Sequence, residues 1–159
     1  MKLKDLLTTF VVLVIKLVYN DALLYSSTVE LSFPLKSSQA CQNGEALLYT
    51  LTSPEAKCID GSPYTFHFRK SKTNSKKWIM FMDSGGWCYT IEDCITRGNT
   101  LLGSSQHNNP PCLSRAKLQH HMDIDQAVNP FMHDWNVVFM RYCDGSSFAS
   151  NTEVIHKVS

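Results

Sequence analysis

The sequence predicts an α/β fold built on a parallel sheet, and two apolar runs carry this prediction. Residues 78–83 (WIMFMD) and 136–142 (NVVFMRY) are short and mostly apolar, which is typical of strands buried on both faces of a parallel sheet. The only adjacent glycine pair of the chain, Gly85-Gly86, comes soon after the first run. Because a strand is followed by a glycine turn, a helix and a second strand, we expect a right-handed connection between the two strands.

Length and composition indicate one globular domain. The 159 residues are 43% hydrophobic and 18% charged, a balance that separates the chain from disordered proteins. The formal net charge is +1, so no nucleic-acid partner is expected.

The first 25 residues have the pattern of a secretory signal peptide. A basic start precedes the uncharged stretch Leu6 to Ile15, which is too short to span a bilayer before Lys16 interrupts it. An uncleaved signal anchor is the alternative, because no clear cleavage site stands near residues 22–27. We therefore expect a secreted protein that contacts a membrane only if this segment stays attached. Residues 26–57 would then be a lead-in to a domain over residues 58–159.

Six cysteines suggest disulfides in a secreted chain. Their pairing does not follow from the sequence, because six cysteines can connect in many ways. A zinc site is the competing interpretation, but the chain has no C-x-x-C pair. Disulfides are therefore expected here in place of a zinc site.

Two more strands are predicted before residue 78. Residues 45–51 form a short candidate strand, and residues 64–69 alternate in a way that predicts a half-buried strand. In that second strand His67 would face solvent, opposite three aromatic side chains, Tyr64, Phe66 and Phe68. The basic connector Lys70–Lys77 is best interpreted as a solvated hairpin tip, although its charge could attract an acidic polysaccharide.

A helix is predicted to begin near Ile91. Thr90 and Asp93 match a capping box with Asp in place of Glu. Cys88 and Cys94 flank this start, and a bridge between them would hold the first helical turn against the glycine turn.

The chain from residue 103 onward is expected to be mostly irregular. Residues 103–112 have the composition of a loop, and residues 113–122 could form a short helix. His120 and His121 are adjacent, so on a helix they would face different directions and make a poor metal pair.

The glycine turn is the candidate functional feature. Glycines at the carboxyl end of a buried strand let the backbone bend sharply and bring its N–H groups close to a ligand. Such N–H groups can form an oxyanion hole in acyl-transfer enzymes. A tight turn with no ligand remains the alternative, because a glycine pair alone is a weak signal.

A nucleophile is harder to identify. The sequence contains no G-x-S-x-G motif, and its nearest match is Gly145–Ala149 with Ser147 in the central position. Only Glu153 and His156 follow, three residues apart, whereas a triad draws these groups from separate strand ends. We therefore do not expect Ser147 to be the nucleophile.

Several spaced motifs resemble the pectin acetylesterase family, which includes the Wnt-deacylating carboxylesterase Notum. The similarity covers about Cys58 to Ser150 and rests on these segments: Cys58-Ile-Asp-Gly-Ser-Pro, Gly85-Gly86-Trp87-Cys88 with Cys94, Arg97 and Asn99-Thr100, Leu102-Gly103-Ser104-Ser105, Asn129-Pro130, Trp135-Asn136 and Arg141–Phe148.

The resemblance implies a secreted serine carboxylesterase of the α/β-hydrolase type without a cofactor. In plant-type members the substrate is acetylated pectin of the cell wall, and the products are acetate and de-acetylated galacturonan. The resemblance assigns the oxyanion hole to the amides of Gly85 and Gly86 and places Trp87 at the border of the acyl pocket. It also implies the bridges Cys88–Cys94 and Cys58–Cys143, which leaves Cys41 and Cys112 either paired together or free.

The chain departs from the family pattern in four ways, and the first is that residues 106–126 match it poorly. Ser84 replaces a third glycine, Asp83 replaces a glutamate, and the family's G-x-S-A-G motif and its later Asp and His would lie beyond the last residue. We therefore expect the amino-terminal part of such an enzyme, with an incomplete α/β-hydrolase sheet and no esterase activity of its own. The 136–142 strand would then lack a neighbour at its edge.

Three other functions remain open. A secreted, non-catalytic module could bind polysaccharide through Trp87, Tyr89 and the 70–77 connector. A Notum-like enzyme would instead deacylate a lipidated protein. A small disulfide-rich protein without a ligand fits the apolar runs least well.

Overall fold

The computed structural model describes residues 41–107 and 109–149. The predicted signal segment, residues 1–25, and much of the lead-in lie outside the described residues. Within the described part, no helix is long and apolar enough to cross a bilayer.

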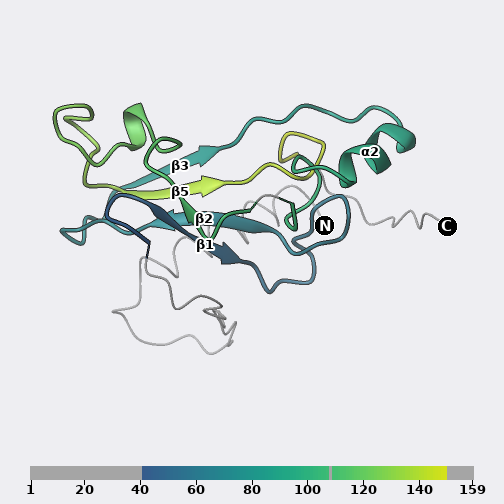
Figure 1. Cartoon of the computed structure of the whole chain (residues 1–159), viewed down its shortest axis with the longest axis horizontal. Coiled ribbons are helices and arrows are strands. Elements are labelled where there is room, and N and C mark those ends of the chain that lie inside the picture. The colour runs from purple at the N-terminus through teal and green to yellow at the C-terminus, as the bar shows by residue number, and fades with distance from the viewer. Residues whose placement is uncertain (1–40, 108, 150–159) are drawn as a thin grey trace.

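Five strands of the described part form one mixed sheet in the order β3-β5-β2-β1-β4 (Figure 1). The strands are β1 (Ala46–Thr50), β2 (Thr65–Arg69), β3 (Trp78–Met82), β4 (Cys112–Leu113) and β5 (Asn136–Met140). β3 and β5 run parallel, as their apolar runs predicted, with Ile79 opposite Val137. The other three pairings are antiparallel. The sheet is therefore a partial α/β arrangement with one parallel pair.

β5, not β3, is the strand buried on both faces. β5 lies between β3 and β2, and all five of its residues are buried. β3 forms the edge of the described sheet, and its Met80 and Met82 side chains are 42% and 59% exposed. The prediction that β3 is buried on both faces was therefore wrong, as was the prediction that β5 would lie at the edge. An apolar run predicts a strand but does not reveal its place in the sheet.

Alternate residues of β5 belong to two separate cores, one on each face of the sheet. Val137 and Phe139 pack with Leu118 and Met122 on one face. Val138 and Met140 pack on the other face with Phe66 and other residues. The period-2 geometry of a strand explains this division.

His67 is buried in the centre of the sheet, and the prediction that it faces solvent was wrong. Its side chain is 0% exposed, and its Nε2 lies 2.9 Å from the Pro110 carbonyl oxygen. The alternating pattern of β2 predicted one polar face. That face is instead covered, because the segment leading into β4 packs against it. Burial lowers the pKa of His67 to about 4.

One helix of the expected kind is present, and a second is not. α2 (Ile91–Gly98) begins as predicted, with the Thr90 hydroxyl accepting from the Asp93 amide at 3.1 Å. Figure 1 shows α2 beyond one end of the sheet, not over a face. Residues 113–122 do not form the predicted helix. Leu113 belongs to β4, where it pairs with Ala46 of β1. The helical structure in this segment is limited to a 3-10 turn, η1 (His120–Met122).

Three disulfides cross-link the described residues. The structure contains the two bridges that the resemblance implied, Cys58–Cys143 and Cys88–Cys94, and it pairs Cys41 with Cys112. Cys58–Cys143 spans 85 residues, and a cross-link over such a loop stabilises a fold by on the order of 4 kcal/mol in the chain-entropy model.

Candidate active site

The glycine turn lies where β3 and β5 both end. Asp83 continues the ladder by one residue, with its amide donating to the Met140 carbonyl at 2.9 Å. The chain then passes along the loop that follows β5, where the Cys88 amide donates to the Gly145 carbonyl at 3.0 Å. Two loops that are far apart in the sequence therefore meet at the carboxyl ends of the parallel pair, where ligands bind in open α/β sheets.

Packing and backbone conformation explain the two glycines. A Cβ atom at Gly85 would lie 1.9 Å from Cδ1 of Tyr142, so no larger residue fits against that ring. Gly86 has φ of +116°, a conformation that other residues rarely adopt. The pair therefore lets the backbone lie directly on the buried Tyr142 side chain.

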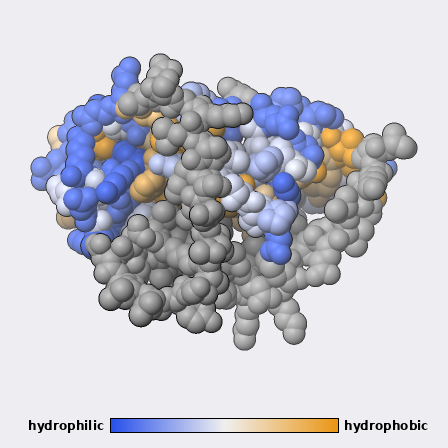
Figure 2. All heavy atoms as spheres, turned by 90° about the horizontal axis from the view of Figure 1, so that it is seen from below, coloured by the Kyte–Doolittle hydropathy of each residue, from blue (hydrophilic) through white to orange (hydrophobic). Residues whose placement is uncertain are grey.

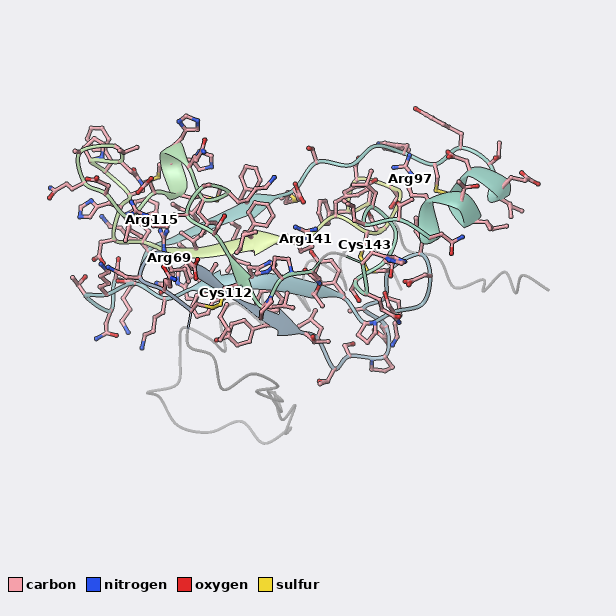
Figure 3. All side chains as sticks on the ribbon, in the orientation of Figure 1. Arg69, Arg97, Cys112, Arg115, Arg141 and Cys143 are labelled. Carbon is pink, nitrogen blue, oxygen red and sulfur yellow. A yellow bond between two sulfur atoms is a disulfide. The ribbon has the colours of Figure 1, made fainter. Side chains whose placement is uncertain are left out.

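Two side chains hold the carbonyl groups of the turn. Arg97, in the last turn of α2, donates from Nη1 to the Gly86 oxygen at 2.7 Å and from Nη2 to the Trp87 oxygen at 3.1 Å. The Tyr142 hydroxyl donates to the same Gly86 oxygen at 2.5 Å. Figure 3 shows Arg97 beside the loop that carries Cys143, at the α2 end of the sheet. Arg97 belongs to one of the family motifs, but its role could not be predicted because its partners are backbone atoms.

Fixing a carbonyl also fixes the amide that shares its peptide plane. The described residues contain no cis peptide bond, and in a trans peptide the N–H points opposite to the C=O. Since Arg97 and Tyr142 hold the Gly86 oxygen, the Trp87 N–H is directed away from both side chains.

Three consecutive amides at this turn remain available. Among the described residues, none accepts a hydrogen bond from the N–H of Gly85, Gly86 or Trp87, and all three residues are exposed. These N–H groups therefore take no part in the strand or helix pairing of the described residues. Such a run of free, oriented amides can bind an anion or a developing oxyanion.

The start of α2 is tied to the turn by covalent and polar contacts. Cys88–Cys94 links the turn to the first helical turn. The Asp93 carboxylate also accepts from the Tyr89 amide at 3.1 Å. Together with Arg97, these contacts make the turn and α2 one unit.

Exposed apolar side chains border the turn. Trp87 is 53% and Tyr89 86% exposed, and Ile91 on α2 is 52% exposed. In Figure 2 a hydrophobic area appears at the right-hand end of the molecule, while hydrophilic residues dominate the left-hand end. The two aromatic residues predicted to contact substrate therefore lie next to the free amides.

The connector Lys70–Lys77 lies at the other end of the sheet. It joins the end of β2 to the start of β3, whereas the glycine turn follows the end of β3. A five-residue strand is about 17 Å long. The polysaccharide surface predicted from Trp87, Tyr89 and this connector is therefore not one continuous surface.

Ser147 contributes a backbone amide to this region. Its N–H donates to the Tyr142 hydroxyl at 3.2 Å, and its φ is 54°. Among residues 41–107 and 109–149, no histidine forms a hydrogen bond with the Ser147 side chain. Glu153 and His156 lie outside the described residues. The described contacts thus give Ser147 a part in holding Tyr142.

Burial keeps a nearby phenol neutral. Tyr64 lies immediately before β2, and its hydroxyl has no hydrogen-bond partner among the described residues. Burial raises the pKa of Tyr64 well above its usual value, and the charge of Asp144 adds to the effect. Tyr64 is therefore protonated at neutral pH and is not a general base.

One group of possible metal ligands exists in the described part of the chain, and it is unsuitable. Cys41, Glu45 and Cys112 lie close together. Both cysteines are oxidised in one disulfide, so they offer no thiolate to a metal ion.

A family model described as Pectinacetylesterase matches residues 36–159. The chain belongs to the pectin acetylesterase family. It is 32% identical to pectin acetylesterase 4 of Arabidopsis thaliana over 152 residues, which is 91% of this chain and 34% of that protein. It is 39% identical to pectin acetylesterase 11 of the same plant over 101 residues, covering 63% of this chain and 25% of the relative. This family contains carboxylesterases.

Notum proteins are also similar to this pectin acetylesterase family member. The human palmitoleoyl-protein carboxylesterase NOTUM is 26% identical over 112 residues, covering 70% of this chain and 21% of that protein. The structure of the Wnt deacylase Notum from Drosophila matches with a TM-score of 0.56 and 27% identity, over 64% of this chain and 28% of that chain. This match supports the predicted α/β-hydrolase type of fold. The chain spans about a quarter to a third of the length of the plant relatives.

Proposed function

We propose that the chain is the oxyanion-binding part of a serine carboxylesterase that removes acetyl groups from pectin and releases acetate. The observation that carries this proposal is the run of free amides at Gly85, Gly86 and Trp87, with the Gly86 carbonyl held from two sides. The plant relatives, at 32% to 39% identity, favour an acetyl ester over the lipid ester of the Notum relatives.

The proposed reaction uses these amides to stabilise negative charge. When a serine attacks the acetyl carbonyl, the oxygen becomes an oxyanion, and N–H donors aimed at it lower the barrier. Losing one such donor typically costs about 3 kcal/mol of transition-state stabilisation. The Trp87 N–H is the strongest candidate because the carbonyl in its peptide plane accepts from both Arg97 and Tyr142.

The attacking serine is proposed to come from a further part of a longer protein. The sequence has no G-x-S-x-G motif, and the plant relatives are roughly three to four times as long as the aligned region. These 159 residues alone should therefore be inactive, because removing the serine and histidine of a triad removes most of its rate enhancement.

Secretion is part of the same proposal. Three disulfides in the described residues favour an oxidising compartment. The basic and then apolar start of the sequence agrees with export, to the cell wall in a plant setting.

The test joins this chain to the part of pectin acetylesterase 4 that follows the aligned region. Acetate release from acetylated pectin is measured for the 159-residue chain and for the joined protein. We expect release only from the joined protein. Turnover of p-nitrophenyl acetate by the 159-residue chain, abolished by Ser147→Ala, would contradict the proposal and make Ser147 the nucleophile.

Two variants of the joined protein isolate the amide. Trp87→Pro removes both the indole and the N–H, whereas Trp87→Ala removes only the indole. We expect kcat for Trp87→Pro to be about a hundredfold below that for Trp87→Ala. Equal kcat values in two folded variants would exclude the Trp87 amide as a donor.

A non-catalytic binding module is the second candidate function. The exposed aromatic side chains of Trp87 and Tyr89 favour it, because aromatic faces are common in ligand sites. Retention of the 159-residue chain on a pectin column, lost in Trp87→Ala, would support this function, and passage without retention would exclude it.

A further inference from the structure

A cavity of about 300 Å³ lies at the end of the sheet opposite the glycine turn. It is formed by the end of β2, the connector that follows it and the loop that leads into β5. Figure 3 shows Arg69, which lines this cavity, far from the region of Arg97 and Cys143. The cavity is therefore separate from the candidate active site.

Two buried nitrogen atoms of its lining residues have no hydrogen-bond partner among the described residues. Arg69 is only 8% exposed, its Nη2 has no hydrogen-bond partner, and its Nη1 lies 3.5 Å from the Gly44 oxygen. The Nδ1 atom of His133 is also buried without a partner. Buried polar groups are usually satisfied, and two of the six buried, unpaired side-chain atoms among the described residues belong to residues that line this cavity.

The charges around the cavity favour an anion. Arg69, Lys70 and Lys72 line it, against a single carboxylate, Asp134. The Asp134 carboxylate already accepts from the hydroxyl of Ser71 at 3.1 Å and from both the amide and the hydroxyl of Thr73. These donors are neutral, so Asp134 keeps its negative charge, and Asp123, outside the lining, also acts electrostatically on Arg69. The lining itself still carries three cationic side chains against one carboxylate, which is an excess of positive charge.

The remaining lining suits a sugar more than a bare ion. Trp135 contributes an aromatic surface to the same cavity, and Asn43 and Thr73 contribute polar side chains. Ligand sites combine apolar and aromatic lining with a few polar groups that fix orientation. The volume, at the lower end of the range for ligand pockets, matches one sugar unit more closely than a length of polymer.

We propose that this cavity binds one acidic sugar unit, with Arg69 holding the carboxylate between Lys70 and Lys72 and with Trp135 lying against the ring. A guanidinium is well matched to a carboxylate because it donates two parallel hydrogen bonds. The choice of galacturonate as this sugar rests on the proposed function, whereas the preference for a carboxylate rests on the cavity alone. The site would hold a pectin chain without taking part in ester cleavage.

The experiment titrates the 159-residue chain with galacturonate, with galactose and with acetate, and follows the indole N–H signals by NMR. Galacturonate should shift the Trp135 signal in a saturable way. Galactose lacks the carboxylate, and acetate lacks the ring, so each should bind about tenfold more weakly. Equal binding of galactose would overturn the role of the cations, and equal binding of acetate would overturn the role of the sugar ring.

Charge-removing variants locate the site. Lys70→Gln combined with Lys72→Gln should weaken galacturonate binding about tenfold. The matched control, Lys57→Gln with Lys76→Gln, removes the same charge from residues outside the cavity and should change the affinity less than twofold. Equal losses in the two pairs would show a general charge effect and overturn the site.

Arg69→Gln tests the buried guanidinium, provided that the amide NMR spectrum of the variant is that of a folded protein. It should abolish the Trp135 shift, and an unchanged shift in a folded variant would contradict the proposal. If Arg69→Gln does not fold, the comparison of the two double lysine variants tests the site instead. The titration of the 159-residue chain involves no ester cleavage, whereas acetate release by the joined protein does, so failure of the proposed esterase function and failure of this site are distinguishable.

Discussion

The two ends of the sheet have different kinds of hydrogen-bond donor for a negatively charged group. At the carboxyl ends of β3 and β5, the donors are backbone amides, and side chains serve only to orient them. At the opposite end, the donors are the side chains of Arg69 and its neighbours. Backbone N–H groups have no flexible side chain and are held in position, so they can stabilise charge that develops on a reacting atom. Long cationic side chains suit an anion that is only held.

Substitutions at one end should leave the other unchanged. The two regions are separated by about the 17 Å length of a strand, and effects at sites that share no contacts usually add. A substitution at one end that changed the other end would show that the two regions are coupled.

The largest effect is expected for Gly85→Ala. Its Cβ would lie 1.9 Å from the Tyr142 ring, so the turn and the ring must move apart. We expect a loss of about 3 kcal/mol in the free energy of unfolding, measured by denaturant titration. Gly61→Ala is the control, because its Cβ would meet nothing within 4 Å, although its φ of +82° should still cost about 1 kcal/mol. Equal losses in the two variants would contradict the described packing.

Acid should destabilise the sheet through His67. Burial lowers the pKa of its folded state to about 4, against 6.5 in the unfolded chain. Between these values the unfolded state binds more protons, so stability is full above pH 6.5 and is lost as the pH falls toward 4. The loss attributable to this group is up to about 3 kcal/mol.

His67→Gln should flatten the stability profile in this pH range, while His107→Gln, at an exposed position, should not. A hydrogen bond from the Thr73 side chain lowers the pKa of Asp134 below its usual value of 3.8. Protonation of Asp134 therefore affects stability only at a lower pH than protonation of His67. An unchanged profile in His67→Gln would show that another group titrates.

A smaller effect is expected for Arg97→Lys. A lysine cannot donate to the Gly86 and Trp87 carbonyls with the fork geometry of a guanidinium. We expect a loss of about 1 kcal/mol in stability and faster hydrogen exchange at the Cys88 amide, which pairs with Gly145. Arg115→Lys, which alters the Arg115–Asp123 ion pair instead, should leave that amide unchanged. Equal exchange rates in both variants would exclude the orienting role of Arg97.

The smallest effect is expected at the exposed edge of the sheet. Met82 is 59% exposed, so Met82→Lys should change the free energy of unfolding by less than about 0.5 kcal/mol. A charged edge should also reduce self-association, which analytical ultracentrifugation can measure. A large loss of stability would show that Met82 is covered by part of the chain.

Local signals predicted much of the fold. The Thr90–Asp93 capping box predicted the start of α2, and the apolar runs predicted the parallel pairing of β3 and β5. The order of the strands depends on contacts between distant segments. For that reason the sequence did not show that β3 lies at the edge or that His67 is buried.

The glycine turn was visible in the sequence, but the groups that act on it were not. Adjacent glycines mark a close approach of the backbone, whereas the hydrogen bonds of Arg97 and Tyr142 to carbonyl groups leave no pattern of residue types. The Arg69 cavity was hidden for a similar reason. Arg69 ends a strand and begins a basic connector, a pattern typical of exposed residues.

An NMR titration of the amide signals with methylphosphonate, a tetrahedral anion, tests the central claim most directly. We expect saturable downfield shifts of the Gly86 and Trp87 amides, weakened in Arg97→Lys and unchanged in Lys70→Gln. Shifts confined to residues around Arg69, with the amides of the glycine turn unmoved, would contradict the claim that this turn holds an oxyanion.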